Sequence, residues 1–230
     1  MPEPVPVFTA QLWRGNADVY AAILEHPFLT GLTDGTLKME TFREYIVQDA
    51  LYLGRFARAV SLVGAKAPDD DSALTLISAS KDALSVERAS LHDFLLAEWG
   101  ISPADISNYS MSPINRAYTD FLIATAYEKP FLTGLSAILP CFWVYLEVGK
   151  ELVKRGSTVE TYRRWIETYS SPGYEEAVRK IIALAEKASE TASVAELDDS
   201  RLVFRLSAIY EYLFWDSISR GERWPLPLRS

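Results

Sequence analysis

The spacing of apolar residues along the chain predicts helices throughout. Between residues 39 and 65, apolar side chains return every three or four positions with few interruptions, which places them on one face of a long helix. No alternating strand pattern, internal repeat or polar linker divides the chain. Further helices are predicted over residues 8–26, 72–99, from 113, 158–168, 172–189 and 199–220. The pattern therefore predicts one all-α domain, a bundle of about eight helices over residues 1–230.

Two Ser-Pro pairs mark helix starts in the middle of the chain. Ser102 and Ser112 are each followed by proline, so each serine is expected to cap a helix in which the proline takes the first position. The stretch from His26 to Gly35 is instead expected to be a connector. Pro27 ends the first apolar pattern, and the Asp-Gly pair at the end of the stretch favours a turn.

Residues 130–146 contain no charged side chain, and their apolar residues point in every direction of a helix. Such a helix must be covered on all sides, which predicts that it lies at the centre of the domain. Gly134 and Pro140 interrupt the apolar run, which falls below the roughly 18 residues expected of a membrane span. Pro140 has no amide hydrogen, so we expect the helix to kink or restart there.

Cys141 follows Pro140 directly and is the only cysteine of the chain. In the first turn of a restarted helix, the helix dipole would increase the fraction of Cys141 present as thiolate. The alternative is a structural role, because free cysteines are among the most buried residues and pack as small apolar side chains.

Two acidic residues lie on apolar helix faces, where burial of an unpaired carboxylate is costly. Asp49 shares its face with aromatic and aliphatic residues one turn away on both sides. For Asp49, a hydrogen bond to a buried hydroxyl or amide and a functional role are equally good explanations. Glu211 is the only charge between Arg205 and Asp216, so burial is expected to keep it protonated to a higher pH than an exposed glutamate. This setting favours a functional role.

Charge and composition exclude several classes of protein. The chain has 23 basic and 31 acidic residues and a net charge of -8, which disfavours binding to nucleic acid. A single cysteine cannot form an intrachain disulfide, and the first residues lack the basic and apolar regions of a secretion signal, so a cytoplasmic location is predicted. Six Trp, twelve Tyr and ten Phe indicate either a tightly filled core or a pocket for a flat ligand.

The sequence also lacks the usual signals for metal and phosphate sites. Neither His26 nor His92 has a glutamate three residues before it, as a di-iron bundle requires. Two histidines so far apart do not suit a zinc site, and His92 is expected to be a packed or surface residue. No glycine-rich phosphate loop is present. We therefore expect no metal site.

Cys141, Asp49 and Glu211 together suit nucleophilic catalysis. A thiolate adds to an electron-poor carbon, and a glutamate that ionises near neutral pH passes protons to and from the thiol or the leaving group. Asp49 is suited to hold an amino-bearing aromatic ring on which tyrosines stack. A Cys-His pair is a second possibility for the same thiol.

Three stretches of the chain resemble the signature segments of the TenA family, also called thiaminase II: residues 42–53, 139–149 and 210–215. The resemblance extends over nearly the whole chain, with further similarity in residues 26–28, 112–119 and 165–169. It implies the haem-oxygenase-like all-helical fold, usually as a homotetramer, and activity without a metal or organic cofactor. Because Cys141 is present, the chain resembles the cysteine-bearing branch of the family.

Matched position by position, the resemblance implies a role for each candidate residue. Cys141 is the expected nucleophile, and Glu211 is the expected acid and base that contacts the pyrimidine. Asp49 is expected to bind the amino and ring-nitrogen edge of that pyrimidine. The residues that match substrate-stacking or hydrogen-bonding tyrosines are Tyr52, Tyr118, Tyr145 and Tyr169. Ala50 and Ile114 differ from the residues common in the family, which concerns the fit of the pocket more than the chemistry.

The implied reaction is hydrolysis of the C-N bond at the pyrimidine methylene group to give hydroxymethylpyrimidine. Thiamin and its breakdown product 4-amino-5-aminomethyl-2-methylpyrimidine present the same pyrimidine, so both are candidate substrates. One alternative is a pyrimidine- or thiamin-binding protein without catalysis, and another is a haem-oxygenase-like enzyme that acts on a different small ligand. The scarcity of histidine disfavours haem, and a helical interaction protein would leave Asp49 and Glu211 unexplained. No membrane or nucleic-acid partner is expected.

Overall fold

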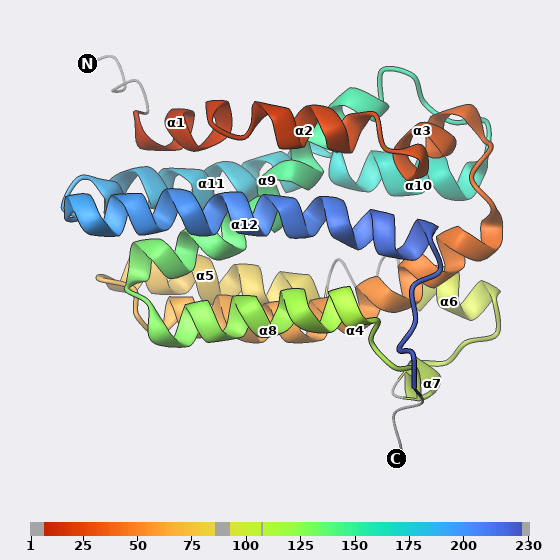
Figure 1. Cartoon of the computed structure of the whole chain (residues 1–230), viewed down its shortest axis with the longest axis horizontal. Coiled ribbons are helices and arrows are strands. Elements are labelled where there is room, and N and C mark those ends of the chain that lie inside the picture. The colour runs from red at the N-terminus through yellow and green to blue at the C-terminus, as the bar shows by residue number, and fades with distance from the viewer. Residues whose placement is uncertain (1–6, 86–92, 107, 227–230) are drawn as a thin grey trace.

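The computed structural model describes residues 7–85, 93–106 and 108–226. These residues form helices joined by turns, and no strand occurs among them (Figure 1). Within these ranges the helices are, in chain order, α1 Phe8–Arg14, α2 Ala17–Leu24, α3 Pro27–Asp34, α4 Met39–Gly64, α5 Asp70–Asp82, α6 Asp93–Glu98, α7 Pro103–Ile106, α8 Pro113–Glu128, α9 Phe131–Leu152, α10 Glu160–Tyr169, α11 Pro172–Ser189 and α12 Val194–Ser219. The expected all-α fold is confirmed, with more and shorter helices than the eight predicted.

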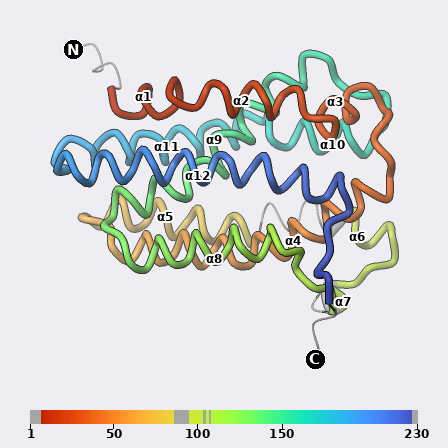
Figure 2. The backbone as a smooth tube through the Cα atoms, in the orientation of Figure 1, coloured from red at the N-terminus to blue at the C-terminus, as the bar shows by residue number. Residues whose placement is uncertain are grey.

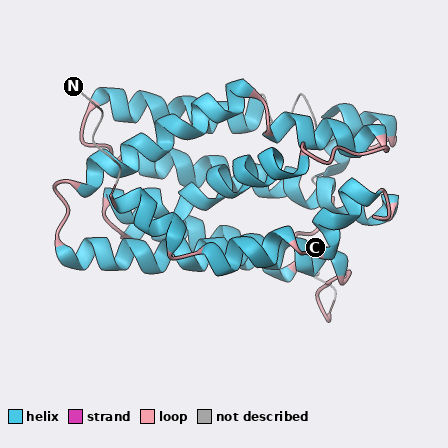
Figure 3. Cartoon of the chain, turned by 90° about the horizontal axis from the view of Figure 1, so that it is seen from above, coloured by secondary structure: helices cyan, strands magenta, loops and turns pink. Residues whose placement is uncertain are grey.

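The long helices run side by side and enclose the core. In Figure 1, α12 lies between the edge formed by α1 and α2 and the layer that contains α4, α5 and α8. Helix α9 packs most extensively on α12 and also contacts α4, α8, α10 and α11. Figure 2 traces this path as a tube, and Figure 3 shows from above that many of the loops lie toward the two ends of the long axis. Helix α9 therefore occupies the centre, as its charge-free sequence predicts.

The N-terminal segment contains three helices where one helix and a connector were predicted. The first break comes at Asn16, whose side-chain amide donates to the carbonyl of Leu12 at 2.7 Å and replaces a hydrogen bond within the helix. The predicted connector is helix α3, in which Nδ1 of His26 accepts from the amide of Phe28 at 3.1 Å and Pro27 takes the first helical position. The prediction was wrong because the side-chain hydrogen bonds of Asn16 at the end of α1 and of His26 at the start of α3 lie at places that apolar spacing does not mark.

Helix α9 continues through Pro140, so the expected restart is wrong. The helix begins at Phe131, and Cys141 therefore lies in its interior and not in a first turn. The argument from the helix dipole does not apply at this position. Ser207 of α12 donates to the carbonyl of Ala137 at 2.6 Å, so a neighbouring helix supplies a hydrogen bond next to the gap left by the missing proline amide.

The length of α9 also corrects the argument about membranes. With 22 residues, α9 is long and apolar enough to cross a bilayer, contrary to the expectation from its interrupted sequence. However, 78% of its most apolar window is buried among the other helices. Its burial, and not its length, marks α9 as the core helix of a bundle.

Two serine caps fix the starts of helices that carry candidate residues. Ser112 accepts a hydrogen bond from the amide of Asn115 at 3.2 Å, which confirms the predicted start of α8. Ser193 accepts from the amide of Glu196 at 3.2 Å, so α12 begins before the predicted Asp199. Helix α11 spans the predicted range.

The predicted helix over residues 72–99 corresponds to α5 and α6. Residues 86–92, which include His92, lie outside the described residues. After α6, Ser102 accepts from the amide of Asp105 at 3.2 Å and caps the short helix α7, as its Ser-Pro pair predicts.

Candidate active site

Four helices carry candidate catalytic and substrate-binding residues into the core. Asp49 and Tyr52 come from α4, Tyr118 from α8, Cys141 from α9 and Glu211 from α12. Their side chains are buried, with exposed fractions of 3% for Asp49, 8% for Cys141 and 2% for Glu211. Buried carboxyl groups require polar partners, so the neighbours of these two acids decide what the site can do.

Glu211 is held by a tyrosine of α8. Tyr118 Oη lies 2.6 Å from Glu211 Oε1 and 2.9 Å from Ser207 Oγ. Ser207 Oγ in turn donates to Ala137 O at 2.6 Å. Burial raises the pKa of Tyr118 well above its usual value, and the charges of Glu211 and Cys141 in their ionised forms raise it further. Tyr118 is therefore a neutral hydroxyl, and it gives Glu211 the polar partner that a buried carboxyl group needs.

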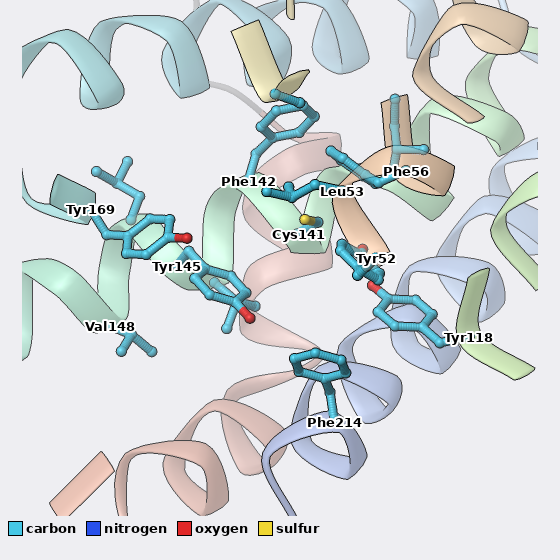
Figure 4. Close-up of a cluster of buried hydrophobic side chains, with 14 of the residues drawn as sticks. Tyr52, Leu53, Phe56, Tyr118, Cys141, Phe142, Tyr145, Val148, Tyr169 and Phe214 are labelled. Carbon is cyan, nitrogen blue, oxygen red and sulfur yellow. The ribbon is translucent and has the colours of Figure 1, made fainter. Parts of the chain in front are cut away.

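Tyr52 lies against the thiol of Cys141, as Figure 4 shows. Among the described residues, no well-aligned hydrogen-bond partner lies within reach of the buried Tyr52 hydroxyl. Burial raises the pKa of Tyr52 well above its usual value, and the Cys141 sulfur raises it further through its charge when ionised and through a loose hydrogen bond. Tyr52 is thus placed to donate to a thiolate at Cys141.

Tyr145 is acted on by both acidic residues. Burial raises the pKa of Tyr145 well above its usual value, and the charges of Tyr45, Glu211 and Asp49 raise it further. Tyr145 Oη also lies 3.4 Å from Tyr45 Oη. Asp49 and Glu211 therefore act on one region of the core, on the same side of α9 as Tyr145. Both acids thus lie near Tyr145, while their chemical roles stay a prediction.

Tyr169 approaches Tyr145 because Gly149 permits a close contact between α9 and the end of α10. The two tyrosine rings have centroids 4.9 Å apart and planes inclined at 52°. A Cβ atom at position 149 would lie 2.7 Å from the carbonyl carbon of Tyr169 and 2.9 Å from the nitrogen of Ser170. Only glycine allows this approach. Tyr169 is the last residue of α10, not part of the joint after it as the apolar spacing predicted.

Aromatic rings form further walls of the site (Figure 4). The rings of Tyr118 and Tyr210 stack with centroids 5.0 Å apart and 7° between their planes. The ring of Tyr52 lies 5.3 Å from that of Tyr118 and 5.8 Å from that of Phe214. Flat apolar surfaces with a few polar atoms between them suit a flat heterocycle.

A hydrogen-bonded pair fixes α4 against α8 beside the site. Gln48 Oε1 accepts from Asn115 Nδ2 at 3.0 Å and from Ser112 N at 2.9 Å. Asn115 Nδ2 also donates to Gln48 O at 2.8 Å. Gln48 directly precedes Asp49, and Asn115 lies one turn before Tyr118, so the pair sets the spacing between two helices of the site. The sequence does not reveal this pair, because Gln and Asn are mostly surface residues.

The described histidine has other partners than the thiol. His26 Nδ1 accepts from Phe28 N, and His26 Nε2 lies 3.7 Å from Asp216 Oδ1. Burial lowers the pKa of His26, and the charge of Asp216 offsets part of this shift. These contacts disfavour a Cys-His pair that uses His26, while His92 lies outside the described residues. Within the described ranges, no group of three or more His, Cys, Asp or Glu side chains is arranged to hold a metal ion.

A surface groove of about 820 Å³ lies apart from the site, where α1, α9 and α11 meet. Trp13 and Trp143 line it with charged residues of both signs, and their rings stack with centroids 4.7 Å apart. None of the candidate catalytic or substrate-binding residues lines this groove. We therefore locate the function by the buried polar groups and not by the size of a surface depression.

Comparison with known proteins gives the same family that the sequence resembles. The model of the TENA/THI-4/PQQC family matches residues 14–221, and the chain belongs to this family. It is 35% identical to the thiamine biosynthesis multifunctional protein ThiED of Corynebacterium glutamicum over 95% of this chain and 28% of that protein. The chain thus spans less than a third of the first curated relatives it matches.

Relatives of about the same length as this chain are named for a single activity. The aminopyrimidine aminohydrolase of Bacillus subtilis is 31% identical to this chain over 94% of its length and 88% of that protein. Among solved structures, a TenA homologue from P. horikoshii is 31% identical, with a TM-score of 0.84 and coverage of 93% of this chain and 99% of that chain. These matches confirm the expected family.

The fold is also confirmed by a more distant structure. A domain with a heme oxygenase-like fold from Shewanella denitrificans has a TM-score of 0.73 and 16% identity, and the match covers 92% of each chain. At this identity the likeness concerns the fold alone. Together with the TenA structure, it shows that the chain has the predicted haem-oxygenase-like fold.

Proposed function

We propose that this chain is an aminopyrimidine aminohydrolase that also acts on thiamin, and that it uses Cys141 as its nucleophile. One observation carries the proposal: Glu211 of α12 acts on buried tyrosines that it shares with the other two candidates. It shares Tyr52 and Tyr118 with Cys141 of α9, and it shares Tyr145 with Asp49 of α4. Relatives with this name, matched over most of both chains, support the substrate class. The other activities of the longer ThiED proteins are not part of the proposal.

The reaction begins at the Cys141 sulfur. The sulfur forms a bond to an electron-poor carbon of the pyrimidine ring, and the displaced electron pair goes to a ring nitrogen, which takes a proton from Glu211. The bond between the methylene carbon and the leaving nitrogen then breaks, and the nitrogen keeps the electron pair. Water adds to the methylene carbon and releases one proton. Departure of the sulfur restores the ring as the ring nitrogen returns its proton to Glu211. The net reaction consumes one water and yields the alcohol and ammonia, or the thiazole when thiamin is the substrate.

The remaining candidate residues hold the ring in place. The Asp49 carboxylate accepts hydrogen bonds from the exocyclic amino group, and its burial strengthens this interaction. Tyr52 donates to the thiolate and so favours the attacking form of the sulfur. Tyr145 and Tyr169 offer ring faces to the heterocycle.

Product analysis with the purified protein tests the substrate class. The protein is incubated separately with 4-amino-5-aminomethyl-2-methylpyrimidine and with thiamin, and hydroxymethylpyrimidine is followed by chromatography. We expect product from both, and the ratio of the two kcat/KM values identifies the better substrate. Thermal stabilisation by either compound without any product contradicts the proposal and supports a pyrimidine-binding protein instead.

The family resemblance also leads us to propose a cytoplasmic homotetramer. Exposed apolar side chains on α12, Leu202 at 58% and Leu206 at 39%, lie one turn apart and support an association surface. Light scattering coupled to size-exclusion chromatography tests the assembly, and a monomer at micromolar concentration contradicts it.

A further inference from the structure

Three short contacts connect Glu211 to a backbone carbonyl. Tyr118 Oη lies 2.6 Å from Glu211 Oε1 and 2.9 Å from Ser207 Oγ, and Ser207 Oγ lies 2.6 Å from Ala137 O. Tyr118 and Ser207 are 0% exposed, so bulk water does not reach these oxygens. Two oxygens at such distances need a proton between them, because their lone pairs otherwise repel.

The last contact determines the direction of all three hydrogen bonds. A carbonyl oxygen only accepts, so Ser207 must donate its single hydroxyl proton to Ala137 O. The contact between Ser207 and Tyr118 then takes the single proton of the tyrosine hydroxyl. The contact between Tyr118 and Glu211 is left for a proton on the carboxyl group. If Glu211 is ionised, two protons serve three contacts and one contact is empty. Further contacts of Glu211 add no proton between these four oxygens.

We propose that Ser207 is a positioning residue that keeps Glu211 protonated before the substrate binds. Fixed on the Ala137 carbonyl, Ser207 turns the Tyr118 proton away from the carboxyl group. The Glu211 proton is then ready for the ring nitrogen when the Cys141 sulfur attacks. The catalytic part of this inference rests on the proposed function, whereas the protonation of Glu211 does not.

The titratable groups around Glu211 act in the same direction. Asp49 of α4 acts on Tyr145 together with Glu211, and Cys141 of α9 acts on Tyr118 together with Glu211. An ionised Glu211 would therefore meet like charge from Asp49 and Cys141 in their ionised forms, and like charge favours the neutral carboxyl group. The tyrosines that face it from α4, α8 and α9 are neutral and do not offset this repulsion.

Infrared spectroscopy of the ligand-free protein tests the protonation directly. A buried protonated carboxyl group has a C=O stretching band separate from the carboxylate bands. Isotope-labelled glutamate and the variant Glu211→Gln assign this band to one residue. We expect the band in the wild-type protein at neutral pH and its loss in Glu211→Gln. If no Glu211 band is present in the wild type at neutral pH, the proposal is overturned.

Three further variants distinguish positioning from a merely structural role. In Ser207→Ala the Tyr118 proton turns to Glu211 and stabilises the carboxylate, so the pH midpoint of the band is expected to fall by about one unit. In Tyr118→Phe no hydroxyl proton can turn to the carboxylate, so the band is expected to persist to at least the wild-type pH. Ser200→Ala is the matched control, because Ser200 is equally buried on α12 and lies 3.1 Å from Thr133 Oγ1 of α9. An unchanged midpoint in Ser207→Ala, or the same fall in all three variants, contradicts the proposal.

The pH dependence of turnover tests the catalytic part. If kcat/KM requires protonated Glu211, the pH at which kcat/KM falls off on the alkaline side is expected to decrease by the same amount in Ser207→Ala. This pH is expected to stay unchanged in Ser200→Ala. A band without turnover of either pyrimidine means that the proposed function is wrong and the protonation inference is right. A band that shifts while the pH at which kcat/KM falls off stays unchanged shows that Ser207 does not position Glu211 for catalysis.

Discussion

Two buried serines of α12 form hydrogen bonds with helix α9, and they differ in the further groups that each one contacts. Ser200 Oγ lies 3.1 Å from Thr133 Oγ1, and within the described residues no titratable side chain hydrogen-bonds to this pair. Two turns later, Ser207 bonds Ala137 O and continues to Tyr118 and Glu211. Both serines are 0% exposed. We call the Ser200–Thr133 pair the Ser200 end, and the contacts of Ser207 with Ala137, Tyr118 and Glu211 the Ser207 end. The comparison teaches that buried polar groups occur both at structural contacts and at sites of chemistry. A connection to an ionisable group distinguishes the second kind from the first.

Within this comparison, the largest expected effect lies at the carboxyl group of Glu211, which ends the Ser207 contacts. Glu211→Gln keeps the shape of the side chain and a partner for Tyr118, but it removes the proton donor. We expect kcat/KM for aminomethylpyrimidine to fall by about 10²- to 10⁴-fold, with little change in thermal stability. Steady-state kinetics and a melting curve measure the two quantities. Activity within a few-fold of the wild type would remove Glu211 from the mechanism.

Gly149→Ala is expected to affect both stability and substrate binding. The new methyl group meets backbone atoms of α10 at 2.7 Å, which overpacking experiments place at about 1–3 kcal/mol of lost unfolding free energy. Displacement of Tyr169 is expected to raise KM more than it lowers kcat. Gly54→Ala in α4 is the matched control, since a Cβ there meets no atom within 4 Å. Equal stability of the two variants contradicts the close contact described here.

At the Ser200 end, Ser200→Ala is expected to act on stability alone. Loss of one buried hydrogen bond costs about 1 kcal/mol of unfolding free energy, and Thr133 is left to find another partner. Chemical denaturation measures this loss, while kcat/KM is expected to stay at the wild-type value. A pH profile altered as in Ser207→Ala would remove the distinction between the two ends.

The smallest expected effect lies far from both ends, where α11 holds α1. Burial alone would raise the pKa of Glu186, but hydrogen bonds from Val7 N, Phe8 N, Thr9 N and Thr9 Oγ1 outweigh it and lower the pKa. A lowered pKa in the folded state means that this stabilisation is present above the ordinary glutamate pKa and is lost as the pH falls through the lowered value. Hydrogen exchange is expected to show weaker protection of α1 in acid, and Glu186→Gln is expected to show it at neutral pH. Equal protection of α1 in Glu186→Gln and wild type at neutral pH would contradict this anchor.

The sequence predicts those parts of the fold whose signals are local. The start of α8 follows from Ser112 and Pro113, and the extent of α11 follows from its apolar spacing. The continuation of α9 through Pro140 does not, because the packing of the surrounding helices on α9 is not visible in its local sequence. The three N-terminal helices were missed for a related reason: their ends depend on side-chain caps such as Asn16 and His26.

The candidate site divides in the same way. Asp49 and Glu211 can be identified from the sequence, because an acidic residue on an apolar helix face stands out in the residue pattern alone. Gly149 and Gln48 cannot, because their roles exist only through contacts with α10 and α8. Ser207 had one usable signal, its position one turn before Glu211, but nothing in the sequence shows that it reaches the Ala137 carbonyl.

The central claim is that the Cys141 sulfur attacks a pyrimidine in this site. Its most direct test is kcat/KM for 4-amino-5-aminomethyl-2-methylpyrimidine in Cys141→Ala, measured beside the wild type and Ser200→Ala at neutral pH. We predict a fall of about 10³-fold or more in Cys141→Ala, because no other group replaces the nucleophile. Turnover of Cys141→Ala at the wild-type rate would contradict the account.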